Sequence, residues 1–127
     1  MSGAMSRRKG ASGEREVVAL AKEYGFPDAE RTAQMQASLG DEKHADVSKI
    51  GRLWVEVKRH AKVSVPGCMK DLLSKERPGF IRVLVHRDNG GKWLATLEAT
   101  ELLKLERDAL RIRPYLSDVL KAEDDAA

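Results

Sequence analysis

The sequence predicts an α/β (α+β) fold, in which a central mixed β-sheet is flanked by helices. Segments with helical apolar spacing alternate with β-rich runs, in the order helix, two or three strands, helix, two strands, helix. A length of 127 residues with 42% apolar residues suits one domain with one core. We therefore expect a flexible basic arm over residues 1–11, a single domain over 12–122 and a disordered tail over 123–127.

The first helix is expected over Ser12–Tyr24, with Ser12 as its N-cap and Gly25 as its stop. Its apolar face recurs at i, i+3, i+4 and i+7, at Val17, Leu20, Ala21 and Tyr24. Glu14 lies above this apolar stripe, whereas Glu16 lies nearer the solvent edge. Of the two acids, Glu14 is the one expected to face inward.

The remaining elements follow from β-propensity, turn residues and helix caps. Strands are expected at Glu30–Ala37, Ala45–Ser48, Leu53–Arg59, Phe80–His86 and Trp93–Leu97. Helices are expected at Pro66–Lys75, Thr100–Leu110 and Tyr115–Ala122.

The strand around Glu56 places an acid and a lysine on one face. Alternate strand residues share a face, so Trp54, Glu56 and Lys58 point one way and Leu53, Val55 and Val57 the other. The second set can enter a core. The first set then holds a carboxylate beside an ammonium group.

A hairpin centred on Gly51 would place Asp46 directly opposite Glu56, since both lie five residues from the centre. Directly opposed residues have Cβ atoms about 5 Å apart on the same face. Two carboxylates at that spacing can share one metal ion. A slip of one residue in the register would break the pairing.

This arrangement suits metal-dependent hydrolysis of a phosphodiester. Carboxylates favour Mg²⁺ or Mn²⁺ over zinc, and the expected ligands are Asp46, Glu56 and the backbone carbonyl of Val57. Lys58 would stabilise charge on the phosphate or orient the attacking water. Glu14 would complete the acidic cluster from the helix and bind the metal directly or through metal-bound water. The alternative is that these are ordinary surface charges, because Glu-x-Lys alone is common.

Charge and composition restrict the partner and the compartment. The net charge is +3, and the excess of basic residues lies in the first half: twelve Lys and Arg against nine Asp and Glu through Lys62, and eleven against eleven thereafter. This favours a phosphate-bearing partner. Cys68 is the only cysteine, which excludes an internal disulfide. Without an apolar run of about 20 residues or a secretory signal, we expect no membrane association and an intracellular, cytoplasmic location.

Four segments of the first half together carry a family resemblance. They read Arg8-Lys9-Gly10-Ala11-Ser12-Gly13-Glu14-Arg15-Glu16-Val17-Val18, Gly25-Phe26, Ala45-Asp46-Val47 and Trp54-Val55-Glu56-Val57-Lys58. Over roughly Arg7 to His60 the chain resembles the archaeal-type Holliday junction resolvases and their phage relatives, within the PD-(D/E)xK nuclease superfamily. Two departures are Ala45, where relatives have proline, and Cys68-Met69-Lys70-Asp71, where relatives often have a glutamine-containing helix.

The resemblance implies a restriction-endonuclease-like fold and a Mg²⁺-dependent enzyme of DNA recombination and repair, in which Mn²⁺ can replace Mg²⁺. The family's helix glutamate falls on Glu14, its metal aspartate on Asp46, its Glu-x-Lys pair on Glu56 and Lys58, and its loop serine nearest to Ser38. A homodimer would nick two opposing strands of a four-way junction symmetrically, with no small-molecule cofactor beyond the metal. The phage relatives would place such a protein in a bacterial host.

Basic residues near the expected site are candidate contacts to the DNA backbone: Arg7, Arg8, Lys9, Arg15, Arg59 and Lys62. His44 lies two residues before Asp46 and is expected to be a loop residue. No pair of histidines has the spacing of a zinc site.

Two alternatives to a junction resolvase stay open. One is a restriction-like or repair endonuclease that acts on flaps or duplex DNA. The other is a small basic DNA-binding protein without catalytic activity, whose acids are surface charges.

Overall fold

The computed structural model describes the backbone of residues 3–32 and 44–126. Within these ranges the elements are α1 (Gly3–Glu23), β1 (Glu30–Arg31), β2 (Val47–Ser48), β3 (Leu53–His60), α3 (Val65–Leu73), β4 (Ile81–Asp88), β5 (Leu94–Thr96) and α4 (Ala99–Ala126). The described strands form one five-stranded sheet in the order β1-β2-β3-β4-β5. Only β3 and β4 pair in parallel, so the sheet is mixed and the expected α+β class is confirmed.

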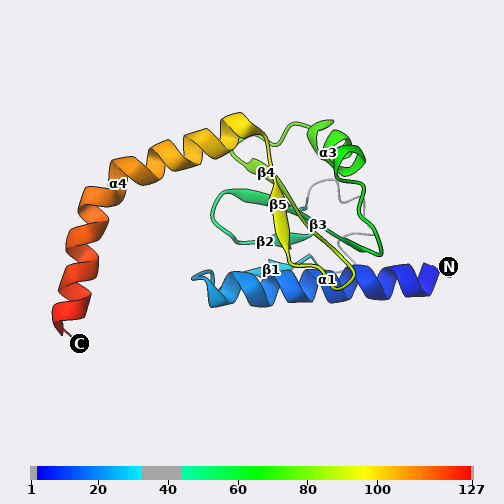
Figure 1. Ribbon diagram of the computed structural model, residues 1–127, viewed down its shortest axis with the longest axis horizontal. Helices are drawn as coiled ribbons and strands as arrows, with labels where there is room; N and C mark the ends of the chain where they lie inside the picture. The colour runs from blue at the N-terminus through cyan, green and yellow to red at the C-terminus, as the bar shows by residue number, and fades with distance from the viewer. Residues whose placement is uncertain (1–2, 33–43, 127) are drawn as a thin grey trace. The chain divides into compact units, whose positions relative to one another are not determined.

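Helices α1 and α3 pack against opposite faces of the sheet (Figure 1). On the α1 face, Val17 packs with Val55, Val57 and Val83. On the α3 face, a second cluster contains Ala45, Trp54, Leu72 and Leu84. The strand around Glu56 therefore divides between its two faces as the alternation predicts.

The turn between β2 and β3 sets the register of the hairpin. Gly51 and Lys49 have φ of 53° and 65°, so the turn includes two residues in the left-handed region. The resulting ladder pairs Val47 with Val55. One residue further out on each strand, Asp46 stands opposite Glu56, which confirms the predicted register.

Helix α1 begins at Gly3, well before the expected cap at Ser12. The segment expected to be a flexible arm consists largely of Ala, Met, Arg and Lys, which are good helix formers, and Gly10 does not interrupt the helix. Ser12 lies inside the helix, where its hydroxyl accepts a hydrogen bond from Arg59 Nη1 at 3.0 Å.

The two C-terminal helices expected from the sequence are one helix, α4, with Pro114 in its interior. A proline there removes one backbone hydrogen bond, and the helix continues on both sides of it. It reaches Ala126, so residues 123–126 are helical where a disordered tail was expected.

The chain divides into two compact units, Met1–Leu97 and Glu98–Ala127, instead of one domain over 12–122. All described members of both core clusters lie in the first unit. In the second unit, large apolar side chains of α4 are exposed, among them Leu103, Ile112 and Tyr115. None of the described helices is long and apolar enough to cross a bilayer.

Candidate active site

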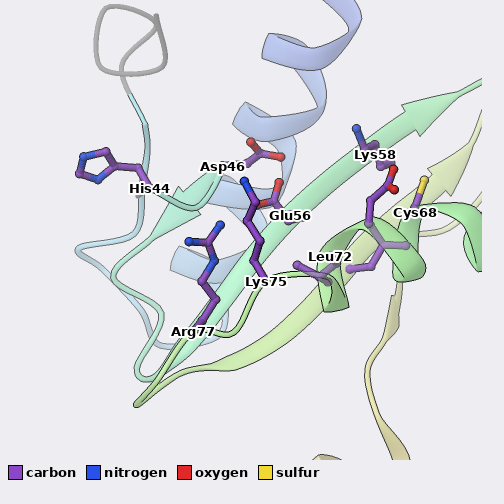
Figure 2. Close-up of a pocket in the computed structure, with 10 residues that line it drawn as sticks. His44, Asp46, Glu56, Lys58, Cys68, Leu72, Lys75 and Arg77 are labelled. Atoms are coloured by element: carbon purple, nitrogen blue, oxygen red, sulfur yellow. The ribbon is translucent and has the colours of Figure 1, made fainter. Parts of the chain in front are cut away.

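Asp46 and Glu56 lie together where β2 meets β3. The Val57 N–H donates to Asp46 Oδ2 at 2.8 Å, which fixes the aspartate against the backbone of β3. Figure 2 shows the carboxyl groups of Asp46 and Glu56 next to each other. The predicted pairing of these two acids is therefore present.

Glu56 is half-buried, and its carboxylate accepts a hydrogen bond from the Trp54 indole N–H at 3.0 Å. Burial and the neighbouring Asp46 carboxylate raise the pKa of Glu56 to about 7. A hydrogen bond to Asp46, which only the protonated acid can donate, acts in the same direction. The Trp54 indole and the Lys58 ammonium partly offset this rise.

Glu14 reaches the pair from α1, as expected of the inward-facing acid. Its Oε2 accepts a hydrogen bond from Arg31 Nε at 3.1 Å. Burial and Asp46 raise the pKa of Glu14, and Arg31 partly offsets them. Since Asp46 raises the pKa of both glutamates, it is the neighbour that Glu14 and Glu56 have in common.

Gly13 allows α1 to approach the sheet closely enough for this. A Cβ at position 13 would lie 3.2 Å from the Arg59 Cβ, 3.5 Å from the Trp93 ring and 3.6 Å from Val57 Cγ1. The absence of a side chain there sets the distance from α1 to β3, and Glu14 is the next residue.

A cavity of about 330 Å³ opens beside the paired acids on the α3 face of the sheet (Figure 2). Its lining combines acids, cations and a few apolar groups: His44, Asp46, Glu56, Lys58, Cys68, Asp71, Leu72, Lys75, Arg77 and Leu84. Lys58 is exposed at its edge, two residues along β3 from Glu56, as the strand pattern predicts. The cavity can therefore hold a metal cation at the acids and, beside it, the negative charge of a ligand near Lys58.

The carbonyl of Val57 lies on the same edge of β3 as its N–H, because a paired strand residue presents both groups to one neighbour. That N–H points to Asp46, so the carbonyl lies on the side of the acids. Ser38 is outside the described residues. The same holds for the side chains of Arg7, Arg8 and Lys9, whose backbone belongs to α1.

Arg59 lies on the opposite face of the sheet from Glu56. Its guanidinium forms an ion pair with Glu16 at 3.3 Å, and Arg87 binds the same carboxylate at 3.0 Å. The expectation that Arg59 flanks the acids is wrong, because odd-numbered residues of β3 face α1. Glu16, expected near the solvent edge, turns to the sheet because two arginines meet it there.

Other candidates lie at the surface. Arg15 and Lys62 are exposed, and Arg15 lies close enough to Glu14 to lower the pKa of that acid. His44 is exposed at the cavity rim, with its ring turned away from Asp46 (Figure 2). By contrast, His86 is buried and shares a hydrogen bond with Thr96.

Sequence reasoning missed three residues of the cavity: Asp71, Lys75 and Arg77. They follow Lys58 by more than ten positions and come from α3 and the segment after it. Their approach depends on how α3 packs on Trp54 and Leu84. The run Arg77-Pro78-Gly79 does predict a turn, but not the strand beside which that turn lies.

The donor set of Asp46 and Glu56 fits a hard divalent cation. Mg²⁺ commonly binds through one or two carboxylates and keeps several waters. The pKa of Glu56 is raised by burial and by the negative charge of Asp46, and a bound cation would offset both effects. Within residues 3–32 and 44–126, no group of three or more His, Cys, Asp or Glu side chains is close enough to form a metal site by itself.

Comparison with models of protein families, with curated proteins and with solved structures finds no match to this chain.

Proposed function

We propose that this protein is a Mg²⁺-dependent, structure-selective DNA endonuclease that cuts four-way junctions. One observation carries the proposal. Asp46 and Glu56, next to each other across the β2–β3 hairpin, hold their carboxyl groups together in a cavity that Lys58 also lines. Burial, followed by the neighbouring Asp46, raises the pKa of Glu56 to about 7. Crowded carboxylates beside a lysine are the arrangement that hydrolysis of a phosphodiester needs.

The protein's own groups would have distinct roles. Asp46 and Glu56 would hold the cation, with the Val57 carbonyl as a further ligand. Each carboxylate is oriented before any ligand binds, Asp46 by the Val57 N–H and Glu56 by the Trp54 indole. Because these carboxylates are already oriented, they lose little conformational entropy when they bind a cation and a substrate.

Lys58 would stabilise charge that develops on the phosphate or orient the attacking water. Glu14, held by Arg31, would act from the second layer through Asp46. When bound, Mg²⁺ or Mn²⁺ polarises the phosphoryl oxygens and lowers the pKa of a coordinated water.

The choice of a four-way junction comes from the resemblance of the motif around Glu14, Asp46 and Glu56 to junction resolvases. That resemblance also supports a homodimer with two sites on one basic face. The excess of basic residues in the first half of the chain favours a nucleic acid over an uncharged substrate.

The test is cleavage of a labelled four-way junction and a matched linear duplex, with Mg²⁺ and with EDTA. We expect paired symmetric nicks on the junction only, in the presence of Mg²⁺. Asp46→Asn and Glu56→Gln should each reduce the rate at least about 100-fold, because each removes a charged ligand of the cation. Junction binding should persist in both variants.

Glu23→Gln is the matched control, since Glu23 is an exposed acid near the end of α1. It should cut like the wild type. Equal cutting of junction and duplex would replace the junction assignment with a flap or duplex endonuclease. Binding without any metal-dependent cutting would favour a non-catalytic DNA-binding protein.

A further inference from the structure

Arg77 and Phe80, the first and last residues of one turn, both pack against the Trp54 ring. The Phe80 N–H donates to the Arg77 carbonyl at 2.9 Å, and Gly79 has φ of 84° after Pro78. This is the pattern of a type II turn. The Arg77 guanidinium carbon lies 4.0 Å from the centroid of the Trp54 ring, and the Phe80 ring meets Trp54 edge to face at 5.5 Å.

The segment before this turn is also fixed. Arg82 of β4 donates from Nη1 to the carbonyl of Lys75 at 2.9 Å and to that of Leu73 at 3.3 Å. The Leu73 carbonyl is one of the last acceptors of α3, which a helix leaves unpaired, and Lys75 lies just past the C-cap residue Ser74. Arg77 therefore projects from a backbone that is held at two points.

Arg77 is connected to the acids through a single aromatic ring. Its guanidinium stacks on Trp54, and the indole N–H of Trp54 donates to Glu56 Oε1 at 3.0 Å. Arg77 and Glu56 line the same cavity. The planar cation is thus held at a defined place next to the carboxylate pair.

Stacking, and not an ion pair, holds this cation. Arg77 forms no salt bridge with any carboxylate that the structure describes, and its Nε is buried without a hydrogen-bond partner among those residues. A half-buried guanidinium that lines a cavity and has no carboxylate partner keeps donors for an anion. Guanidinium binds phosphate through paired N–H groups better than ammonium does.

We propose that Arg77, stacked on Trp54, binds a backbone phosphate of the substrate in the cavity beside Glu56. The identity of the anion as a nucleic-acid phosphate rests on the proposed function. Arg77 takes the place that the sequence analysis gave to Arg59, which faces α1 instead.

The experiment is the binding of a fluorescein-labelled four-way junction in EDTA, followed by anisotropy over a series of NaCl concentrations. Each phosphate contact adds about 0.9 to the slope of log K against log salt concentration. Arg77→Gln should lower that slope by about one and weaken binding several-fold. Arg77→Lys should keep the slope, because it keeps the charge, with weaker binding than the wild type.

Lys92→Gln is the matched control, because it also removes one positive charge. Lys92 is exposed just before β5, at the edge of the sheet opposite to β1, and does not line the cavity. This variant should leave the slope unchanged. A wild-type slope in Arg77→Gln, or an equal loss in Lys92→Gln, overturns the proposal. If Arg77→Gln melts more than about 5 °C below the wild type, Arg77→Met, whose stem can still cover the indole, provides the same comparison.

Cutting assays separate this inference from the proposed function. A wild type that never cuts the junction, together with a lowered slope in Arg77→Gln, removes the nuclease and supports the phosphate contact. Wild-type cutting that is lost in Glu56→Gln, together with an unchanged slope in Arg77→Gln, leaves the nuclease and removes the contact.

Discussion

At the scale of single residues, Glu56 is a carboxylate whose surroundings disfavour its negative charge. Its side chain is half-buried beside another carboxylate, yet among the residues that the structure describes it accepts a hydrogen bond from one N–H group, the indole of Trp54. An acid in such a place favours the protonated form. The folded protein therefore tolerates the charge of Glu56 at a cost in stability.

The charge of Glu56 should make the stability of the protein depend on pH. The pKa of Glu56 rises from 4.5 to about 7 on folding. The free energy of unfolding that this group contributes is therefore fully present below pH 4.5, where the acid is protonated, and is lost as the pH rises through 7. Glu56→Gln resembles the protonated acid. At pH 8 in EDTA it should unfold at higher urea concentration than the wild type, with a gain of about 2–3 kcal/mol.

At pH 4.5 the two proteins should have nearly equal stability. Glu23→Gln, measured in parallel, reports the effect of removing one exposed negative charge. A Glu56→Gln variant that is less stable than the wild type at pH 8 would contradict the crowding of the two acids.

The sequence predicts the Asp46–Glu56 pair because the pairing needs only a turn and a register. The turn residue Gly51 and the alternation of β3 together determine both. The environments of Glu16 and Arg59 are different, because they depend on Arg87, which arrives from β4 far along the chain. Local periodicity contains no information about that contact.

At the scale of elements, the contact between α1 and β3 determines where Glu14 lies. The contact is made at Gly13, where the nearest neighbour of a Cβ would be the Cβ of Arg59, an atom fixed to the strand backbone. A larger residue can be accommodated only if the helix moves away from the sheet. That movement would carry Glu14 away from Asp46.

Gly13→Ala should therefore destabilise the protein. The added methyl group brings a gain of about 1 kcal/mol in helix propensity but an overpacking cost of about 1–3 kcal/mol, so we expect a net loss of about 1 kcal/mol by urea unfolding. Gly10→Ala is the control on the same helix, since a Cβ there has no neighbour within 4 Å. It should stabilise by up to about 1 kcal/mol. Equal effects at both positions would contradict the close approach.

The existence of most elements follows from the sequence, whereas their ends do not. Strands β3 and β4 have the strong apolar alternation or continuous burial that predicts them. The predicted ends of α1 and α4 were wrong, because a glycine or a proline does not always end a helix inside a run of good helix formers. Gly10 and Pro114 each lower helix stability without ending the helix.

At the scale of the whole molecule, the chain divides after Leu97, and the described members of both core clusters lie in the first unit. The buried apolar residues lie between Val17 and Leu84. The second unit is essentially α4, and most of the large apolar side chains described on it are exposed, whereas Leu105 is half-buried. Composition could not predict this, because an exposed leucine and a packed leucine count equally in it.

A chain that ends at Glu98 should therefore fold. All described members of the two core clusters remain in it, so we expect cooperative urea unfolding with a free energy of unfolding close to that of the full chain. Circular dichroism should show the loss of helical signal that belongs to α4 alone. Unfolding without cooperativity would show that α4 supports the core.

The pKa of Glu56 near 7 has a consequence for what the cavity attracts. Around neutrality its lining changes by one unit of charge when the pH moves by about one unit either way. On the acid side the balance among Asp46, Lys58 and Arg77 shifts toward positive charge and favours anions. On the alkaline side, ionised Glu56 brings the three acids of the lining level with its three cations, Lys58, Lys75 and Arg77. A small rise in pH therefore removes the net positive charge of the walls, and with it their preference for anions.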